Sequence, residues 1–278
     1  GNLFKTKTDE LTVEAQSITL ITKSLRPMPE KHKGLVDIEI KYRQRYLDLM
    51  SSPESKLIFE KRSQIISSIR ATMLDDGFLE VETPMMHSIP GGAVARPFVT
   101  QHNALDRELF LRIAPELHLK RLLVGGFEKV FEINRSFRNE GLSTKHNPEF
   151  TMLEFYTAFA TFNGTLAFTQ SIIQSASEAI GNKKEIEWDG EKIDLSNFST
   201  KSLSDLVLEY NPKLTEVDLD DLDKLRAYAE SIKISVKDKW GEGKILLEIF
   251  EKTVEEKLIQ PTFVIQYPVE VSPLSRRN

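Results

Sequence analysis

The chain has 278 residues, 40% of them hydrophobic and 28% charged, with no cysteine and a formal net charge of −5. This composition excludes a disordered, fibrous or disulfide-stapled protein, and it leaves room for one large domain or two smaller ones. The negative charge argues against a protein that binds nucleic acid over its whole surface, but it does not exclude local basic patches. The sequence shows no basic-then-apolar leader and no apolar run of membrane length, so we expect a cytoplasmic protein.

Apolar and polar side chains alternate through residues 1–26, which predicts two or three β-strands. We interpret these strands as the last part of a small β barrel. No room precedes them to complete a sheet, and the chain stops soon after a strand-like segment at 262–267, so we expect a piece of something longer. The alternating positions are Leu11, Val13, Ala15, Ile18, Leu20 and Thr22.

Residues 27–50 are predicted to form a linker that ends in a short helix at 38–50. A longer helix is expected from Pro53 to about Leu74, because proline is favoured in the first turn and an apolar stripe follows at helical spacing. Gly77 is the expected stop of that helix.

The rest of the chain reads as strands with a few helices between them, which predicts an α+β fold built on an antiparallel sheet flanked by helices. A glycine-rich loop is expected at 88–98, and a hairpin at 186–195 turns around Asp189–Gly190. Strands are predicted at 78–86, 108–113, 129–134, 149–159 and 262–267, and helices at 115–124, 165–180, 201–210, 218–231 and 242–257.

The strand at 149–159 has two unlike faces, because side chains alternate across a strand. One face is mostly apolar and is predicted to join the core, with Thr151, Leu153, Phe155 and Thr157. The other face carries Phe150, Met152, Glu154 and Tyr156. A carboxylate placed among large apolar groups requires a cation or hydrogen-bond donors. Glu154 therefore either lies at a sheet edge or pairs with a structural arginine, or else it binds a ligand ammonium.

The loop before this strand carries several polar side chains whose roles stay open from spacing alone. Arg138 and Glu140 are two apart and could contact a phosphate and a base, or form a surface ion pair. Glu116 sits in the first turn of a predicted helix, where the helix dipole favours an acid in any case. His146 precedes Asn147 and a proline, which is typical of a turn.

Taken together, these segments resemble the class II aminoacyl-tRNA synthetases. The run "FRNEGLSTKHNPEFTMLE" (137–154) resembles their motif 2, and "GFLEVETPMM" (77–86) resembles their motif 1. The flanking runs "KYRQRYLDL", "PGGAVARPF" and "VEVSPLSRRN" resemble the lysyl branch of that family. The resemblance covers essentially the whole chain, and motif 2 with its flanks is highly specific.

The resemblance implies a role for each matching residue. Arg138 would hold the ATP α-phosphate and the carboxylate of L-lysine together, and Phe150 would stack on the adenine. Glu140 and Asn147 would lie near the adenine, and His146 near the distal phosphates. The amino acid would be bound by Gly92, Glu116, Met152, Glu154 and Tyr156. The tRNA(Lys) acceptor end would meet the loop tip at Leu142, Ser143, Thr144 and Lys145.

The resemblance also implies an arrangement of domains and partners. Residues 1–26 would end an OB-fold anticodon-binding domain, 27–50 would link, and 51–278 would begin the catalytic domain. The family uses ATP and Mg²⁺ and forms homodimers through the motif 1 region, here about 55–86.

The third motif of the class is missing from this sequence, and the family's metal-binding and late lysine-binding acids would fall beyond Asn278. We therefore expect that the chain alone does not aminoacylate tRNA. The alternatives are the aspartyl or asparaginyl branch, a paralogue that attaches lysine to a protein, and a non-catalytic dimerisation or binding fragment.

Overall fold

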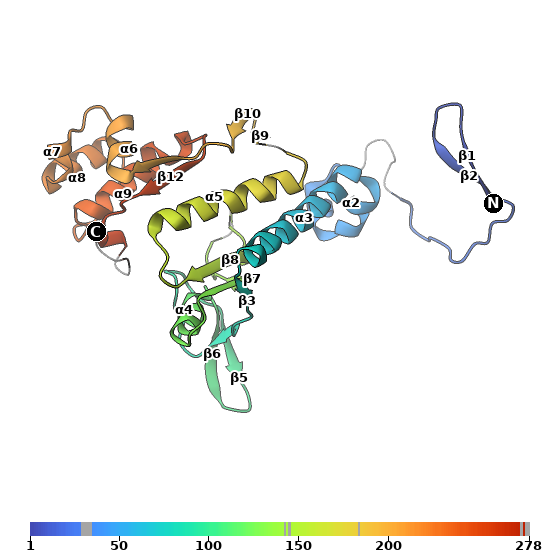
Figure 1. Cartoon of the computed structure of the whole chain (residues 1–278), viewed down its shortest axis with the longest axis horizontal. Coiled ribbons are helices and arrows are strands. Elements are labelled where there is room, and N and C mark those ends of the chain that lie inside the picture. Colours follow the sequence, from blue (N-terminus) through green and yellow to red (C-terminus); the bar gives the residue numbers. More distant parts are fainter. Residues whose placement is uncertain (29–34, 142, 144–145, 183, 273–274, 276–278) are drawn as a thin grey trace. The chain divides into compact units, whose positions relative to one another are not determined.

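The structure is a computed structural model of the chain, and it describes all residues except 29–34, 142, 144–145, 183, 273–274 and 276–278 (Figure 1). The chain divides into two compact units, Gly1–Arg62 and Ser63–Asn278.

The N-terminal unit contains a short hairpin and helices. Strands β1 (Asn2–Lys5) and β2 (Leu11–Glu14) pair in antiparallel register. They confirm two of the predicted strands and are consistent with a remnant of an OB-fold. A third strand at 18–22 was the wrong prediction, because this stretch is irregular and forms no ladder. Alternation alone does not make a strand where no neighbouring strand is present to accept its backbone hydrogen bonds.

The predicted helix at 38–50 is two helices, α1 (Ile38–Arg43) and α2 (Arg45–Ser51). They are separated by Gln44, whose φ of −118° is not helical. The Asp37 side chain caps α1 by accepting from two backbone N–H groups. The long helix α3 (Pro53–Asp75) has the predicted bounds, and Gly77 follows it with a φ of +82°.

The central sheet of the second unit has the order β3-β7-β8. Strands β7 (Lys129–Phe137) and β8 (Glu149–Thr157) form a long antiparallel hairpin, which confirms the predicted strands. The short strand β3 (Leu79–Glu80) runs parallel to β7. The β7–β8 hairpin thus bears out the predicted antiparallel sheet, to which β3 adds one short parallel pair.

One face of the β7–β8 hairpin is buried under helices. Leu153 and Phe155 pack there with Phe131 and Met73, which confirms the apolar face predicted from alternation. Helix α5 (Phe162–Ala179) lies along the hairpin (Figure 1), and its Ile172 and Phe168 belong to the same cluster. Aromatic rings fix the geometry further, because the Phe78 ring stacks on that of Phe168 at 5.2 Å and meets that of Phe131 edge-on at 6.5 Å. The opposite face of the hairpin is left for polar groups.

A second sheet, of order β4-β6-β5, adjoins the start of a helix. It consists of β4 (Met86–His87), β5 (Val99–His102) and β6 (Arg107–Leu111), all antiparallel. Helix α4 (Glu116–Val124) follows as predicted. Strand β5 was not predicted, because it follows directly on the glycine-rich loop.

The remaining helices have their own core, in which Leu206, Ile245 and Ile249 are fully buried. The hairpin of β9 (Glu185–Trp188) and β10 (Glu191–Asp194) turns at Asp189–Gly190, where both residues have positive φ as predicted.

Two helix predictions need correction, because α6 begins only after strand β11 and because the helix at 218–231 is broken in two. The bounds are β11 Ser199–Ser202, α6 Leu203–Tyr210, α7 Glu216–Leu219, α8 Leu222–Ser231, α9 Glu242–Thr253, the 3₁₀ turns η1 Glu255–Lys257 and η2 Val269–Val271, and β12 Thr262–Ile265, which is parallel to β11.

The core beneath the β7–β8 hairpin makes a stability prediction. Phe131→Ala removes a fully buried ring and should cost about 3–5 kcal/mol of unfolding free energy. Urea unfolding followed by far-UV circular dichroism measures the loss. Phe162→Ala is the matched control, since that ring is 59% exposed and its removal should change little. Equal losses in the two variants would contradict this assignment of the core.

Candidate functional site

A cavity of about 260 Å³ opens where β7 and β8 leave the sheet. The hairpin brings its walls together, because the last residues of β7 and the first of β8 are paired in register. All five residues predicted to contact ATP line this cavity. The lining residues are Arg138, Glu140, Gly141, His146, Asn147, Pro148 and Phe150.

Arg138 is the central polar group of this cavity. Its backbone N–H donates to the Pro148 carbonyl at 2.8 Å, which holds the two sides of the loop together. Its guanidinium carbon lies 5.1 Å from the centre of the Phe150 ring, a cation–π distance. The Arg138 Nε is buried and has no hydrogen-bond partner among the described residues. A buried, unpaired guanidinium N–H is costly, so this atom is suited to an anionic ligand.

The tip of the loop is described only in part. Ser143 and His146 form an isolated antiparallel bridge, and the Ser143 hydroxyl lies 2.8 Å from His146 Nδ1. This contact fixes one edge of the His146 ring at the cavity wall. Of the predicted tRNA-contact residues, Leu142, Thr144 and Lys145 lie outside the described residues.

A second polar cluster lies further along the same face of β8. The Tyr156 hydroxyl donates to Glu154 Oε2 at 3.2 Å. Helix α4 contributes Glu116, which pairs with Lys120 at 2.5 Å. The Lys120 ammonium also lies 5.9 Å from the centre of the Tyr156 ring, so α4 and β8 meet at this cluster.

Gly92 closes the cluster from the glycine-rich loop. Its φ is +91°, a conformation that favours glycine. A Cβ atom there would approach the Cβ atoms of Glu116 and Ala114 to 3.1 and 3.2 Å. The structure thus brings four of the predicted amino-acid-binding residues, Gly92, Glu116, Glu154 and Tyr156, to one place.

Burial is the main cause that raises the pKa of Glu154 above its ordinary value. The hydrogen bond from Tyr156 opposes this rise, and the nearby Glu116 carboxylate adds to it. Burial likewise raises the pKa of the Tyr156 phenol. A half-buried carboxylate whose ionised form is disfavoured is stabilised when a cation binds beside it.

Met152 lies between the two clusters, since the side chains of Phe150, Met152 and Glu154 alternate onto one face of β8. At a rise of about 3.4 Å per residue, the backbone positions of Phe150 and Glu154 are about 14 Å apart. The face can therefore hold an anion at one end and a cation at the other.

Sequence reasoning missed the most deeply buried charges near the site. Arg112 and Glu132 form an ion pair at 2.7 Å, and each side chain is 1% exposed. Glu132 lies opposite Glu154 in the β7–β8 register. The available signal was the pairing of "KVFEIN" with the following strand, because counting back from the hairpin loop places the two glutamates across from each other.

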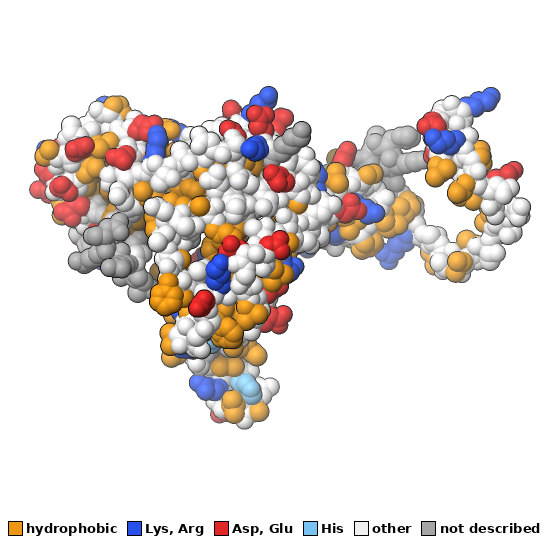
Figure 2. Space-filling view, in the orientation of Figure 1, with side chains coloured by type: hydrophobic (Ala, Val, Ile, Leu, Met, Phe, Trp, Pro, Cys, Tyr) orange, Lys and Arg blue, Asp and Glu red, His pale blue; other side chains and the backbone are white. Residues whose placement is uncertain are grey.

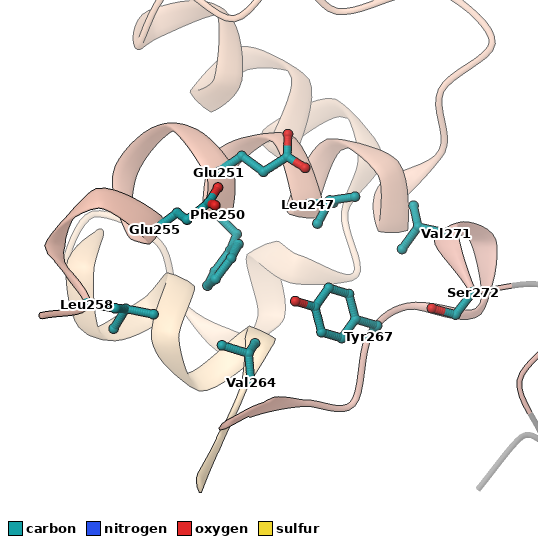
Figure 3. Close-up of a pocket in the computed structure, with 9 residues that line it drawn as sticks. All are labelled: Leu247, Phe250, Glu251, Glu255, Leu258, Val264, Tyr267, Val271 and Ser272. Carbon is teal, nitrogen blue, oxygen red and sulfur yellow. The ribbon is translucent and has the colours of Figure 1, made fainter. Parts of the chain in front are cut away.

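A second cavity, of about 670 Å³, lies elsewhere, among α9, η1 and β12. Phe250, Val264 and Tyr267 point into the same space (Figure 3). Its charged groups are Glu251 and Glu255, and burial raises the pKa of Glu251. Among the described residues that line this cavity, there is none of the predicted site residues and no Lys or Arg.

The described residues contain no group of three or more His, Cys, Asp or Glu side chains placed to hold a metal ion. No described helix is long and apolar enough to cross a membrane.

Comparison with known proteins gives a family and close relatives. The family described as tRNA synthetases class II (D, K and N) matches residues 37–278. A lysine–tRNA ligase of Yersinia enterocolitica is 53% identical over 279 aligned positions, which cover 100% of this chain and 55% of that protein. Lysine–tRNA ligases of Yersinia pestis and Yersinia pseudotuberculosis match equally well. The chain therefore spans about half the length of the curated relatives it matches.

The raised pKa of Glu154 makes a prediction about stability and pH. Because the folded pKa is above the unfolded one, ionised Glu154 destabilises the fold at neutral pH, and the penalty vanishes as the pH falls below the unfolded pKa. Glu154→Gln should therefore raise Tm at pH 8, by an amount that shrinks toward pH 4. Differential scanning calorimetry measures both. The control is Glu149→Gln, an exposed glutamate on the same strand; a lower Tm for Glu154→Gln at pH 8 would refute the expectation.

Proposed function

Since the chain belongs to the class II tRNA synthetases (D, K and N), we propose that the protein carrying it is a lysine–tRNA ligase. In this proposal the protein works in the cytoplasm, activates L-lysine with ATP, and transfers the lysyl group to tRNA(Lys). The observation that carries it is that two different groups lie along one face of β8. At its start, beside Phe150, lies the Arg138 Nε, which has no hydrogen-bond partner among the described residues, and further along lies Glu154, whose pKa is raised by burial.

The first step would be attack of the lysine carboxylate oxygen on the α-phosphorus of ATP. A new P–O bond forms as the bond to pyrophosphate breaks, which yields lysyl-adenylate. Positioning and charge stabilisation dominate such reactions. Arg138 would contact both the carboxylate and the α-phosphate, and so would reduce the repulsion between two anions. The buried Nε of Arg138, which has no hydrogen-bond partner in the described part of the chain, supports this role.

The remaining residues of the 260 Å³ cavity would hold the nucleotide. Phe150 would stack on the adenine, Glu140 and Asn147 would contact the adenine and its surroundings, and His146 would lie near the distal phosphates. Class II synthetases use ATP and Mg²⁺, and the metal ion, when bound, neutralises charge on the phosphates.

The second cluster would select the amino acid. Glu116 would hold the α-amino group beside Gly92, whereas Glu154, Tyr156 and Met152 would surround the side chain. A shorter or neutral side chain would leave buried polar groups unpaired, which gives strong rejection. The aspartyl or asparaginyl branch is the second candidate, but an aspartate side chain would meet the carboxylates of Glu116 and Glu154.

Transfer of the lysyl group to tRNA would follow at the loop tip, where Ser143 pairs with His146 at the wall of the nucleotide cavity.

We also propose that residues 1–26 end an OB-fold anticodon-binding domain, that 27–50 link it, and that 51–278 begin the catalytic domain. Large apolar side chains are exposed along the N-terminal unit (Figure 2), and Ile18, Ile21 and Leu25 are each about 90% exposed, with values of 89, 94 and 90%. Such exposure fits segments that are covered by further protein.

Homodimer formation through about 55–86 is part of the proposal. Within this region Leu57, Ile58 and Phe59 are 47, 67 and 45% exposed in the single chain. Large apolar side chains that are this exposed on α3 fit a surface that a partner covers.

The role of Arg138 gives a test in the whole protein. Arg138→Ala should lower the rate of lysine-dependent ATP–pyrophosphate exchange by about 10²–10³ or more, because it removes charge stabilisation of the reacting phosphate. Arg135→Ala is the control, since Arg135 projects from the opposite face of β7 toward Glu149. Exchange that survives Arg138→Ala at the parent rate would rule out the assigned site.

The identity of the amino acid gives a second test. Lysine at 100 times its dissociation constant should stabilise the folded protein by about 2.7 kcal/mol, and aspartate at the same concentration should not. A thermal-shift assay of the whole protein measures both. Stabilisation by aspartate or asparagine but not by lysine would favour the other branch of the family.

A further inference from the structure

The site contains an unusual pair of like charges. Glu132 and Glu154 lie directly opposite each other on adjacent antiparallel strands. Two carboxylates in such a position repel each other across the strand pair. Glu132 is only 1% exposed, so water does not screen it. Something in the fold must therefore compensate one of the two charges.

Arg112, which follows directly on β6, provides the compensation. Its Nη1 donates to Glu132 Oε1 at 2.7 Å, and its Nε donates to the Arg135 carbonyl at 2.7 Å. The other oxygen of Glu132 accepts from the Thr83 hydroxyl at 2.6 Å. Asn134 adds a bond to Oε1 at 3.1 Å. Both oxygens of Glu132 are thus occupied within the protein.

Glu154 is left in a different state. It accepts from the Tyr156 hydroxyl, and no described Lys or Arg forms an ion pair with it. On the other wall of the cluster, Glu116 is already paired with Lys120. Arg112 with Glu132, and Lys120 with Glu116, are both neutral pairs. Glu154 therefore carries the one negative charge that these described groups leave uncompensated.

We propose that Arg112 and Glu132 act as a closed neutral pair that sets the charge of the amino-acid pocket. Because Glu132 engages the guanidinium, Glu154 keeps its charge for the ammonium of the ligand. Arg112 and Glu132 are positioning residues in this account, since they act through Glu154. The inference rests on the proposed function, because it takes the ligand to be an amino acid with a cationic side chain.

The protonation of Glu154 supports the same arrangement. The nearby Glu132 raises the pKa of Glu154 and Arg112 lowers it, so the two members of the pair oppose each other there. The other groups that face Glu154 are Glu116 from α4 and the Tyr156 phenol on β8. Removing Glu132 alone would leave the positive charge of Arg112 unpaired near Glu154. That charge should lower the pKa of Glu154 and also weaken the attraction of the pocket for a ligand cation. Removing both members should leave the balance nearly unchanged.

The test compares Glu132→Gln with the double variant Arg112→Gln/Glu132→Gln in the whole protein. Isothermal titration measures the Kd of lysine and of norleucine, which has the same four-carbon side chain without the ammonium. Glu132→Gln should weaken lysine binding about tenfold and norleucine binding little, and it should move the acid limit of lysine binding to lower pH. The double variant should return to within about threefold of the parent lysine Kd.

A merely structural role predicts the opposite order, because the double variant loses more of the buried network than the single one. Weaker lysine binding by the double variant than by Glu132→Gln would thus overturn the inference, as would equal binding by all three proteins. Failure of the parent itself to bind lysine would refute the proposed function instead.

A charge-conserving variant keeps the inference testable if Glu132→Gln does not fold. Arg112→Lys keeps the cation but loses the planar fork. It should retain the parent ratio of lysine to norleucine affinity. Equal affinities of Arg112→Lys for lysine and norleucine, as a pocket without charge would show, would overturn the inference.

Discussion

The antiparallel register of β7 and β8 is the constraint on which the site depends. It turns one face of the hairpin toward the aromatic core of α3 and α5, and the other toward ligands. Because side chains alternate, burying Phe131, Leu153 and Phe155 necessarily presents Glu132, Glu154 and Tyr156 on the opposite face. A slip of one residue would exchange the two sets. Stability of the core and placement of the site are therefore one requirement.

The charges on the ligand face follow from how deeply each one is buried. The Arg112–Glu132 pair is fully enclosed and hydrogen-bonded, whereas Glu154 is half-buried and the Arg138 Nε has no partner among the described residues. The structural charges thus have their partners within the protein, whereas the charges that would contact a ligand do not among the described residues. That difference separates a carboxylate that stabilises the fold from one that is available to a substrate.

Much of this arrangement could be predicted from the sequence, and the failures have local causes. Alternation along "EFTMLEFYT" placed Leu153 and Phe155 in the core and Glu154 and Tyr156 together, because a long central strand has a partner that enforces its period. The same rule failed at Ile18–Leu20, with which none of the described strands pairs. The resemblance to a family supplied Gly92 and Glu116, which come from separate loops and helices. Arg112 and Glu132 were missed because a buried pair is visible only in the register between strands.

The most direct test of the account is a carbon-13 NMR titration of the Glu154 carboxyl in the whole protein, with and without lysine. The account predicts a pKa above the ordinary glutamate value in the free protein and a clear fall when lysine binds, with no change on adding norleucine. An ordinary pKa that lysine does not alter would contradict the claim that this face of β8 is built to receive a cation.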